Sequence, residues 1–439
     1  MKNTIKYISV EEAMQKVRSG DHLHWSCAAA APEYLIQELV ARGARREIRD
    51  IYISHLYTEG YADYVLPQYE GVFHLDSFFV GGNVREATQA RRADYIPCSL
   101  NEVPLIVRSG DRRSDVVMIM VSDPNSAGNV SMGTSVDYML AAMEQARCVI
   151  AQVNTFMPYT YGDALLNIKD GHVALKNGRH VPIFFVRHDE PLKEAVVTPL
   201  SETDIAIGKH TAELIPDGAT LQIGIGNIPT AVLSQLGDHK DLGVHSEMFT
   251  DDVIPLVESG VINGRFKRID PGKLVAMFLK GTRKLYDFAD RNPDVLVDDV
   301  WYTNAPLAIA KNPKVCAINS ALQIDLTGQV CADSIGTRIY SGSGGQLDFI
   351  IGATYSTGGL PIIAMPSTTK KGMSKIVPML APGSGVVTPR TLVQWVITEY
   401  GAVNLHGRSL SERCKLLISI AHPMHREELE RQAKEVGII

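Results

Sequence analysis

The chain has 439 residues, which is too long for one ordinary hydrophobic core and predicts two domains of roughly 200 residues each. Its 45% hydrophobic and 21% charged residues are typical of a soluble globular protein. The formal charge of −6 comes without a long run of one sign, which argues against nucleic acid and anionic membranes as main partners.

Short apolar runs alternate with helical patterns along the whole chain. The runs expected to form strands are 48–57, 115–122, 148–154, 180–188, 219–226, 314–325 and 360–366. Apolar residues recur at helical spacing in 33–43 and 135–147, and the capping sequence Ser201–Asp204 predicts the start of a further helix. This alternation predicts an α/β architecture with largely parallel sheets.

A polar stretch with two prolines, 187–204, separates the halves of the chain. It places a boundary near residue 195 and predicts domains 1–195 and 196–439.

A weak internal repeat accompanies this division. Both 20–32 and 218–229 begin with glycine, continue as a strand pattern and end at a proline that opens a helical pattern. The segment 127–135 also resembles 327–334. From the sequence alone, both duplication of one α/β unit and chance similarity explain the repeat.

The first candidate site segment is GIGNIP, Gly224–Pro229, which follows a predicted strand and precedes a helical pattern. Its glycines let a ligand approach the backbone, and amides at a helix start attract anions or an oxyanion. Pro229 stands where a dinucleotide-binding fingerprint needs glycine, so that interpretation is disfavoured. An ordinary strand-to-helix turn is the alternative.

Glu247 is the second candidate. Its neighbours Val244, Met248 and Phe249 are apolar and are expected to desolvate the carboxylate. An ionised carboxylate is a stronger nucleophile when it is desolvated. The alternative is a solvent-facing glutamate at a strand end.

Two further segments carry polar groups that a ligand would need. The predicted loop 339–353 has four glycines whose amides are able to reach a carbonyl oxygen, and a surface turn is the alternative. The segment 365–375 places Lys370, Lys371 and Lys375 close together for phosphate binding, and a solvated basic loop is the alternative.

Other chemistries find little support in the sequence. The six cysteines are scattered singly, without zinc-ligand or disulfide spacing, which suits a reducing cytosol. The pairs His22/His24 and His422/His425 lack a third ligand at useful spacing, so we expect no metal site. There is no signal peptide at the start and no run of ~18 apolar residues, so we expect a cytoplasmic protein without a membrane span.

Taken together, the motifs resemble the acetyl-CoA hydrolase/transferase family, especially the 4-hydroxybutyrate and butyryl-CoA:acetate CoA-transferases. The likeness rests on QIGIGNIPTAVLSQL (222–236), GVHSEMFTD (243–251), FLKGTRKLYDFA (278–289), CADSIGTRIYSGSGGQLDFIIGA (331–353), IIAMPSTTKKG (362–372) and VVTPRTLVQWVITEYGAVNLHGRSL (386–410). It covers essentially the whole chain and is more specific in the second half.

The resemblance implies two similar open α/β domains, an active site in the cleft between them, and a homodimer. It also implies that Glu247 becomes a glutamyl-CoA thioester. Coenzyme A is then a substrate, with no permanently bound cofactor, and short-chain acyl-CoA and carboxylates are the partners. The implied coenzyme A contacts are Gly224, Ile225, Gly226, Asn227, Ile228, Leu322, Gly345 and Lys370, with Lys371 as the alternative to Lys370.

The expected reaction moves coenzyme A between 4-hydroxybutyryl-CoA or butyryl-CoA and an acid such as acetate. The amides around Ile225 and Gly344–Gly345 are the candidate oxyanion donors. Two alternatives remain: an acyl-CoA hydrolase that uses the same Glu247, and a non-catalytic acyl-CoA-binding module.

Overall fold

The computed structural model describes residues 5–439 of the chain. The chain divides into two compact units. The first unit contains the residues up to Ala195 together with Val275–Thr303, and the second contains Val196–Leu274 and Asn304–Ile439. The chain therefore returns to the first unit after the predicted boundary near residue 195, before it enters the second unit again.

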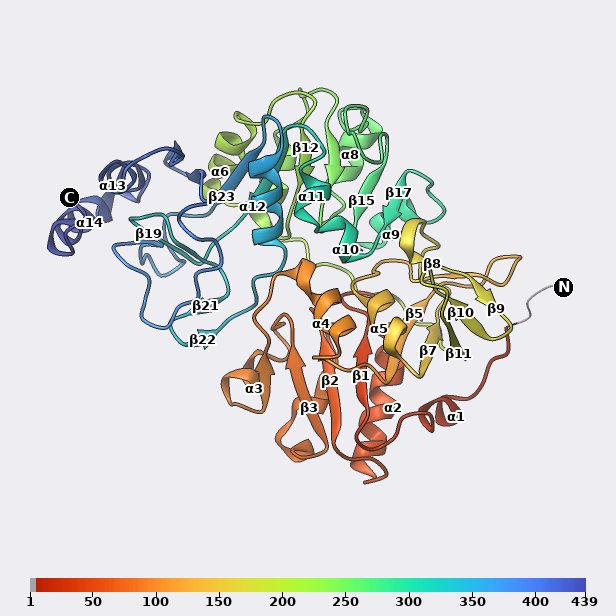
Figure 1. Ribbon diagram of the computed structural model, residues 1–439. Coiled ribbons are helices and arrows are strands. Elements are labelled where there is room, and N and C mark those ends of the chain that lie inside the picture. The colour runs from red at the N-terminus through yellow and green to blue at the C-terminus, as the bar shows by residue number, and fades with distance from the viewer. Residues whose placement is uncertain (1–4) are drawn as a thin grey trace. The chain divides into compact units, whose positions relative to one another are not determined.

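The first unit is built on a nine-stranded sheet in the order β4-β3-β2-β1-β5-β7-β11-β10-β9, drawn red to yellow in Figure 1. All neighbouring strands from β4 to β11 are parallel. Strand β10 is antiparallel to β11, and β9 is antiparallel to β10. The strands are β1 (His22–Trp25), β2 (Ile51–His55), β3 (Phe73–Ser77), β4 (Ala93–Tyr95), β5 (Val116–Val121), β7 (Cys148–Val153), β9 (Ile168–Lys169), β10 (His172–Ala174) and β11 (His180–Arg187).

The two central strands are apolar except for Gln152 of β7. Every residue of β5, VVMIMV, and of β7, CVIAQV, is buried. Continuous apolar runs are typical of parallel strands that are covered on both faces. The chain forms β2, β3 and β4 on one side of β1 and then crosses to β5 on the other side, so the strand order reverses between β1 and β5.

Short helices connect the strands of the first unit. Helix α2 buries Leu35, Ile36, Leu39 and Val40 on one face, as its helical spacing predicts. The elements are α1 (Val10–Met14), α2 (Glu33–Ala44), η1 (Asp63–Val65), η2 (Pro67–Tyr69), α3 (Arg85–Gln89), η3 (Leu100–Glu102), α4 (Val103–Ser109), β6 (Val130–Ser131), α5 (Met139–Gln145), η4 (Gly162–Ala164) and β8 (Leu165–Leu166). The returning segment adds β15 (Leu274–Ala276), β16 (Phe278–Leu279), α9 (Arg283–Ala289), β17 (Val295–Val297) and α10 (Val300–Thr303).

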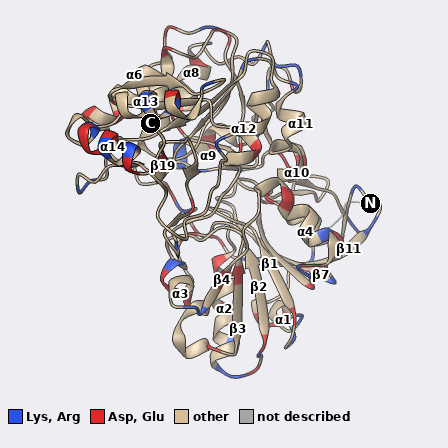
Figure 2. Ribbon diagram, turned by 60° about the vertical axis from the view of Figure 1, so that its left-hand side comes forward, with Lys and Arg blue, Asp and Glu red and all other residues tan. Residues whose placement is uncertain are grey.

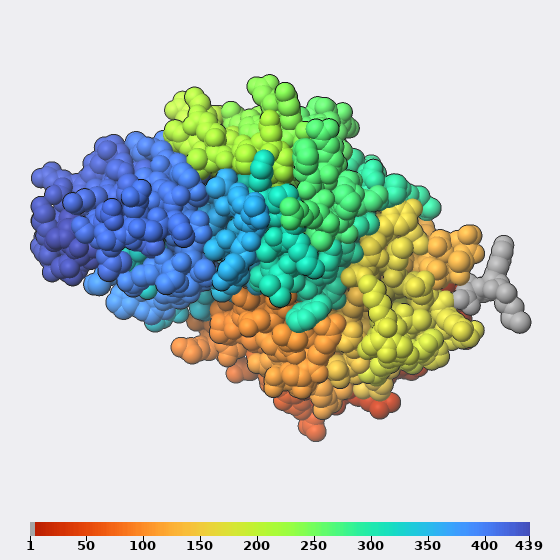
Figure 3. All heavy atoms as spheres, turned by 45° about the horizontal axis from the view of Figure 1, so that its top comes forward, coloured from red at the N-terminus to blue at the C-terminus, as the bar shows by residue number. Residues whose placement is uncertain are grey.

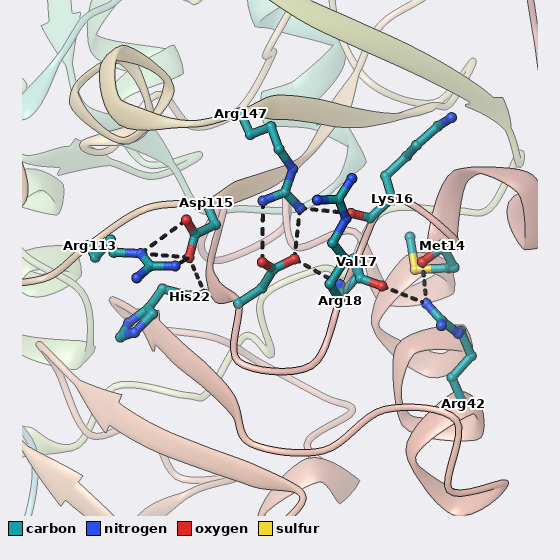
Figure 4. Close-up of polar contacts among 10 residues, drawn as sticks. Met14, Lys16, Val17, Arg18, His22, Arg42, Arg113, Asp115 and Arg147 are labelled. Carbon is teal, nitrogen blue, oxygen red and sulfur yellow. Dashed lines mark hydrogen bonds and ion pairs between the residues drawn. The ribbon is translucent and has the colours of Figure 1, made fainter.

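Polar contacts secure the amino ends of β1 and β5 (Figure 4). Arg147 binds both carboxylate oxygens of Asp21, at 3.2 and 2.8 Å. Asp115 accepts from Arg113 at 3.0 Å and from the backbone amide of His22 at 2.9 Å. Because Asp21 is 5% exposed, its charge needs this partner. We assign the amino edge of this sheet a structural role.

The second unit has its own sheet, in which six strands run in the order β13-β12-β18-β23-β25-β26. The strands from β13 to β25 are parallel, and β26 is antiparallel to β25. These strands are β12 (Thr220–Gln222), β13 (Gly243–His245), β18 (Val315–Asn319), β23 (Leu360–Ala364), β25 (Trp395–Thr398) and β26 (Gly401–Asn404). A smaller sheet contains β20 (Val330–Cys331), β19 (Gln323–Asp325) and β24 (Ile376–Val377).

Helix α12 packs on this sheet through Phe349 and Ala353, which form a core with Val315 and Ala317 of β18. The charged helix α14 carries both signs on its outer face (Figure 2), with ion pairs between Arg431 and its neighbours. It is dark blue in the space-filling view (Figure 3). The remaining elements are α6 (Glu202–Ala212), α7 (Asn227–Ser234), β14 (Met248–Phe249), α8 (Val253–Glu258), α11 (Pro306–Ile309), β21 (Ser334–Ile335), β22 (Arg338–Ile339), α12 (Gln346–Tyr355), α13 (Leu410–Ser419) and α14 (Pro423–Glu435).

The two units repeat one another in topology and in a turn. In both, the strand order reverses beside the first strand, between β1 and β5 and between β12 and β18. Asn125 Oδ1 accepts from the amides of residues 127 and 129, and Asp325 Oδ1 accepts from those of 327 and 329. Gly128 and Gly328 take positive φ in these turns, 84° and 96°. The shared topology and turn favour duplication over chance as the origin of the sequence repeat.

The predicted α/β architecture with parallel sheets is confirmed, and so is the helix capped by Ser201, whose hydroxyl accepts from the amide of Asp204. Two elements differ from the prediction. The strand expected over 314–325 is β18 and β19 with a break between them, and the helix expected from residue 135 starts at Met139. Asp137 prevents the earlier start because its φ is 54°.

Among residues 5–439, no helix is long and apolar enough to cross a bilayer.

Candidate active site

The candidate residues follow four neighbouring strands of the second unit. Glu247 comes two residues after β13, the segment 224–228 follows β12, Leu322 follows β18, and Lys370 follows β23. Because these strands are adjacent and parallel, their carboxyl ends lie at one edge of the sheet. The strand order reverses between β12 and β18, and ligands of open α/β sheets bind at such a switch point.

Ser246 ties the Glu247 segment to the end of β12. Its hydroxyl oxygen accepts from the backbone amide of Ile223 at 3.0 Å and donates to the carbonyl oxygen of Ile223 at 2.9 Å. Ser246 is fully buried, so these bonds are shielded from water. Since Ile223 precedes Gly224 directly, the glycine turn and Glu247 are held together by one side chain.

The glycine turn leads into α7 two residues earlier than predicted. We expected Pro229 to open the helix, but α7 begins at Asn227 and Pro229 is its third residue. Gly226 stands before it with φ 107°, a conformation that favours glycine. Asn227 is fixed by its side chain, which donates to Asp204 at 3.1 Å. Ile225 is 51% exposed, so the turn offers its backbone to a ligand.

Glu247 is half-buried, and the amino end of α12 contacts its carboxylate. The backbone amide of Gly345 donates to Glu247 Oε2 at 2.8 Å. Gly345 is the residue before Gln346, where α12 starts, and a helix amino terminus stabilises negative charge. A methyl group on Gly345 would lie 2.2 Å from Oε2, so only glycine permits this approach.

The predicted loop 339–353 is therefore wrong in its second half. Residues 346–355 form α12, because Phe349, Ile350 and Ala353 share a buried face at helical spacing. Only the part before the helix, which includes Gly344 with φ 55°, is a loop.

Two polar residues near Glu247 were not among the predicted site residues. Asn304 Nδ2 lies 3.4 Å from Glu247 Oε2 and 3.5 Å from Asp348 Oδ2, so one amide links two carboxyl groups. Asn304 is fully buried and Asp348 is 3% exposed. The sequence signal for Asn304 was weak: an asparagine before Ala305–Pro306 reads as an ordinary helix start. Buried polar groups need partners, and only the fold supplies these.

The three lysines of the predicted cluster differ in their exposure to solvent. Lys370 and Lys371 are exposed, whereas Lys375 is largely covered, and burial lowers its pKa to about 8 against the opposing charge of Glu399. Burial opposes ionisation of Asp204, but hydrogen bonds from Ser201 and Asn227 and the charge of Lys370 lower its pKa. Lys370 is thus electrostatically coupled to the carboxylate that binds Asn227 of the glycine turn.

Leu322 is held at the same edge by its backbone. Its amide donates to the carbonyl of Cys331 at 2.9 Å. The side chain of Gln346, the first residue of α12, donates to the carbonyl of Ser320 at 2.7 Å. Asn319 at the end of β18 donates to Gln222 at the end of β12, at 2.9 Å. The segments that carry Leu322, Gly345 and the glycine turn are therefore linked by direct hydrogen bonds.

The structure contains no group of three or more His, Cys, Asp or Glu residues that could hold a metal ion, within the part of the chain that it describes. His22 instead stacks on Tyr52, with ring centroids 4.6 Å apart, and His24 contacts Tyr138 and the carbonyl of Arg113.

Comparison with known proteins assigns both halves of the chain to one family. The model of the acetyl-CoA hydrolase/transferase N-terminal domain matches residues 2–198, and that of the C-terminal domain matches residues 281–433. A succinyl-CoA:acetate/propanoyl-CoA:succinate CoA transferase of Fasciola hepatica is 46% identical over 96% of this chain and 86% of its own length. A 4-hydroxybutyrate coenzyme A transferase of Clostridium kluyveri is 42% identical over 98% and 97%.

Solved structures agree in fold over the whole chain. The crystal structure of RipA from Yersinia pestis superposes with a TM-score of 0.91 at 32% identity, covering 99% of this chain and 98% of that one. A 4-hydroxybutyrate CoA-transferase from Porphyromonas gingivalis gives a TM-score of 0.81 at 36% identity, covering 98% of each chain.

Proposed function

This chain belongs to the acetyl-CoA hydrolase/transferase family, as its motifs predicted, and we propose that it transfers coenzyme A from a short-chain acyl-CoA to a carboxylate, with Glu247 as the covalent nucleophile. The observation that carries this proposal is the 2.8 Å hydrogen bond from the Gly345 amide to the Glu247 carboxylate. The well-covered relatives are named as CoA transferases, which supports the same class of reaction here.

The first half-reaction forms an anhydride. Glu247 Oε1 attacks the thioester carbonyl of the acyl-CoA, while Gly345 holds the other oxygen, Oε2, and so orients the carboxylate. The C–S bond breaks and coenzyme A leaves as the thiolate. An acyl-glutamyl anhydride remains, and both of its acyl carbons are open to attack by the thiolate.

The thiolate then attacks the glutamyl carbon of the anhydride, whose carbonyl oxygen is Oε2. Negative charge develops on that oxygen, where the Gly345 amide already donates and the Asn304 amide lies 3.4 Å away. The amide that orients the nucleophile in the first step thus becomes the oxyanion donor in the second. The first acid departs, glutamyl-CoA remains, and an incoming carboxylate reverses these steps.

We propose that the coenzyme A contacts are Gly224, Ile225, Gly226, Asn227, Ile228, Leu322, Gly345 and Lys370. The shared sheet edge supports this set, because all of these residues follow adjacent parallel strands or lie at the start of α12. The exposed ammonium of Lys370 suits a phosphate group. Lys371 is also exposed and remains the alternative.

The acyl substrate is proposed to be 4-hydroxybutyryl-CoA or butyryl-CoA, with acetate as the acceptor. The names of the relatives support this range and extend it to succinyl-CoA and propanoyl-CoA. We also propose a cytoplasmic homodimer whose chains have the domains 1–195 and 196–439, with residues 275–303 of the second domain packed in the first compact unit. All six cysteines are free thiols, which suits a reducing compartment.

Borohydride trapping tests the covalent step. The protein is incubated with butyryl-CoA, reduced, digested and analysed by mass spectrometry. We expect residue 247 to carry the primary alcohol that reduction of a thioester yields, and Glu247→Gln to abolish both the mark and turnover. Glu258→Gln, which changes an exposed glutamate of the same unit, is the matched control and should keep both. A mark on another residue refutes the assignment.

Product analysis separates transfer from hydrolysis. With butyryl-CoA and acetate, a transferase forms acetyl-CoA and butyrate without net loss of thioester. Release of free coenzyme A at the same rate without acetate would make the protein a hydrolase. Binding of acyl-CoA without any turnover would leave only a binding module.

A further inference from the structure

Lys370 and Lys371 stand at the tip of a closed turn of the second unit. The amide of Gly372 donates to the carbonyl of Thr369 at 2.9 Å, so the two lysines are the central residues of a four-residue turn. We call residues 369–372 the lysine turn. Both lysine side chains are exposed, and neighbouring ammonium groups repel each other. Lysines on a turn without an anchor lose more conformational freedom when they bind a ligand, which weakens binding.

The base of the lysine turn is fixed at the carboxyl edge of the sheet. Ser367, three residues after β23, donates to the carboxylate of Glu399 through its amide at 2.9 Å and its hydroxyl at 2.6 Å. Glu399 directly follows β25. On the returning side, the amide of Lys375 donates to the carbonyl of Ser367 at 2.9 Å. Both ends of the segment are therefore held at the edge where the proposed coenzyme A contacts lie.

The lysine turn itself contacts a side chain of helix α14. Nε2 of His425 lies 2.8 Å from the carbonyl oxygen of Gly372. Since a carbonyl oxygen only accepts hydrogen bonds, Nε2 carries the proton and is the donor. His425 is half-buried and follows Gly372 by 53 residues. The contact therefore joins the lysine turn to an element that is remote in the sequence.

The position of His425 is set by the core of the second unit. Helix α14 buries Leu429 and Ala433 in a cluster that also contains Ile363 of β23. The ring of His425 packs against that of His422, with ring centroids 5.9 Å apart and planes at 61°. His425 is therefore held by contacts that do not involve the lysines, and the lysine turn is bonded to it.

We propose that His425 is a positioning residue for coenzyme A. Its hydrogen bond to Gly372 holds the lysine turn in the conformation that presents Lys370 and Lys371 to a phosphate group of the ligand. This role rests on the proposed function, because it takes the lysine turn as part of the coenzyme A site. His425 acts through the turn, since the proton on Nε2 is already donated to Gly372.

Calorimetric titration with free coenzyme A tests the proposal. His425→Phe keeps a ring against His422 but removes the donor, and should raise the dissociation constant about two- to fivefold, the contribution of an exposed pair of opposite charges. His425→Gln restores a donor without the ring and should bind like the wild type. His406→Phe, which changes an exposed histidine of the same unit, is the matched control and should also bind like the wild type. Thermal unfolding checks that each variant folds, and His425→Ala replaces a phenylalanine variant that does not.

The double variant Lys370→Ala/Lys371→Ala separates positioning from direct contact. If His425 acts through these lysines, His425→Phe should weaken binding no further in the double variant, because the two changes remove the same interaction. The same weakening in both backgrounds would overturn the proposal, and so would an unchanged dissociation constant in His425→Phe. Absence of saturable binding by the wild type up to about 10 mM would also overturn it.

The binding measurement also distinguishes this proposal from the proposed reaction. A protein that binds coenzyme A with the expected dependence on His425 but transfers none would refute the reaction and keep the role of His425. A protein that transfers coenzyme A with equal affinity in all histidine variants would keep the reaction and refute the role of His425.

Discussion

Replacement of Gly345 by alanine isolates the contact on which the proposed mechanism depends. The backbone at Gly345 has φ −89° and ψ 8°, which alanine adopts without strain. The new methyl carbon would lie 2.2 Å from Glu247 Oε2 and 2.3 Å from Asn304 Nδ2. Both atoms are ends of side chains, so the protein should fold and the two side chains should move.

The size of the effect follows from this geometry. Real Cβ atoms essentially never come within 3.0 Å of another heavy atom, so Oε2 must retreat by roughly 0.8 Å from its 2.2 Å position. That displacement breaks the 2.8 Å bond from the Gly345 amide. Loss of one oxyanion donor costs about 10²–10³ in rate, or roughly 3–4 kcal/mol of transition-state stabilisation. We expect kcat/KM to fall by that factor.

The assay is acetyl-CoA formation from butyryl-CoA and acetate, measured beside thermal unfolding. The matched control is Gly237→Ala in the same unit, where an added methyl meets nothing within 4 Å. Each variant should unfold within a few degrees of the wild type, because replacing glycine by alanine changes stability by only about 0.4–1 kcal/mol where the backbone permits it. A Gly345→Ala protein that folds and keeps kcat/KM within about threefold of the wild type would refute the assigned role of this amide.

Four further changes probe the remaining contacts. Asn304→Ala should lower kcat about tenfold with little effect on KM, because its 3.4 Å contact to Oε2 is longer than a strong hydrogen bond. Ser246→Ala should reduce the free energy of unfolding by about 1–3 kcal/mol in urea titration, since it removes the hydroxyl that hydrogen-bonds both the amide and the carbonyl of Ile223. Lys370→Ala should raise KM for acyl-CoA about two- to fivefold, less at high salt, with kcat unchanged. Burial lowers the pKa of His24 and His55 to about 4, so the folded protein binds fewer protons than the unfolded chain below pH ~6.5. The free energy of unfolding should therefore fall between pH ~6.5 and ~4, by up to roughly 3 kcal/mol per histidine. His24→Gln should make this decline shallower in thermal unfolding measured across that pH range.

The helices and strands that depend on neighbouring residues alone were predicted correctly from sequence patterns. The buried runs of β5 and β7 and the cap at Ser201 were all identified from sequence. The errors occurred where a tertiary contact decides the outcome. The run 314–325 reads as one strand, but Gln346, far along the chain, donates to the carbonyl of Ser320 and fixes a break there. Asp137 delays the start of α5 through its φ of 54°, and its carboxylate accepts from the amide of Cys27, 110 residues earlier.

The same limit applies to the candidate site. Motif spacing singled out Glu247 and Gly345 separately, but no sequence pattern states that the amide of one donates to the carboxylate of the other, 98 residues away. Asn304 lies in an unremarkable helix start and was missed for that reason. Its partners Glu247 and Asp348 lie far from it in the sequence. They come close to it only in the folded sheet, where the order of the strands differs from their order along the chain.

The repeated fold also explains why the proposed chemistry belongs to one unit. Strand register aligns the two sheets: Leu23 pairs with Ile53 in the first, as Leu221 pairs with Val244 in the second. Leu56 lies three residues after Ile53, as Glu247 lies three residues after Val244, so Leu56 is the equivalent of Glu247 in the first sheet. Leu56 is 2% exposed and apolar, so the first sheet has no carboxylate at the position equivalent to Glu247. Duplication therefore supplied two sheets with the same switch point, and the carboxylate at one of them determines where coenzyme A is proposed to be bound covalently.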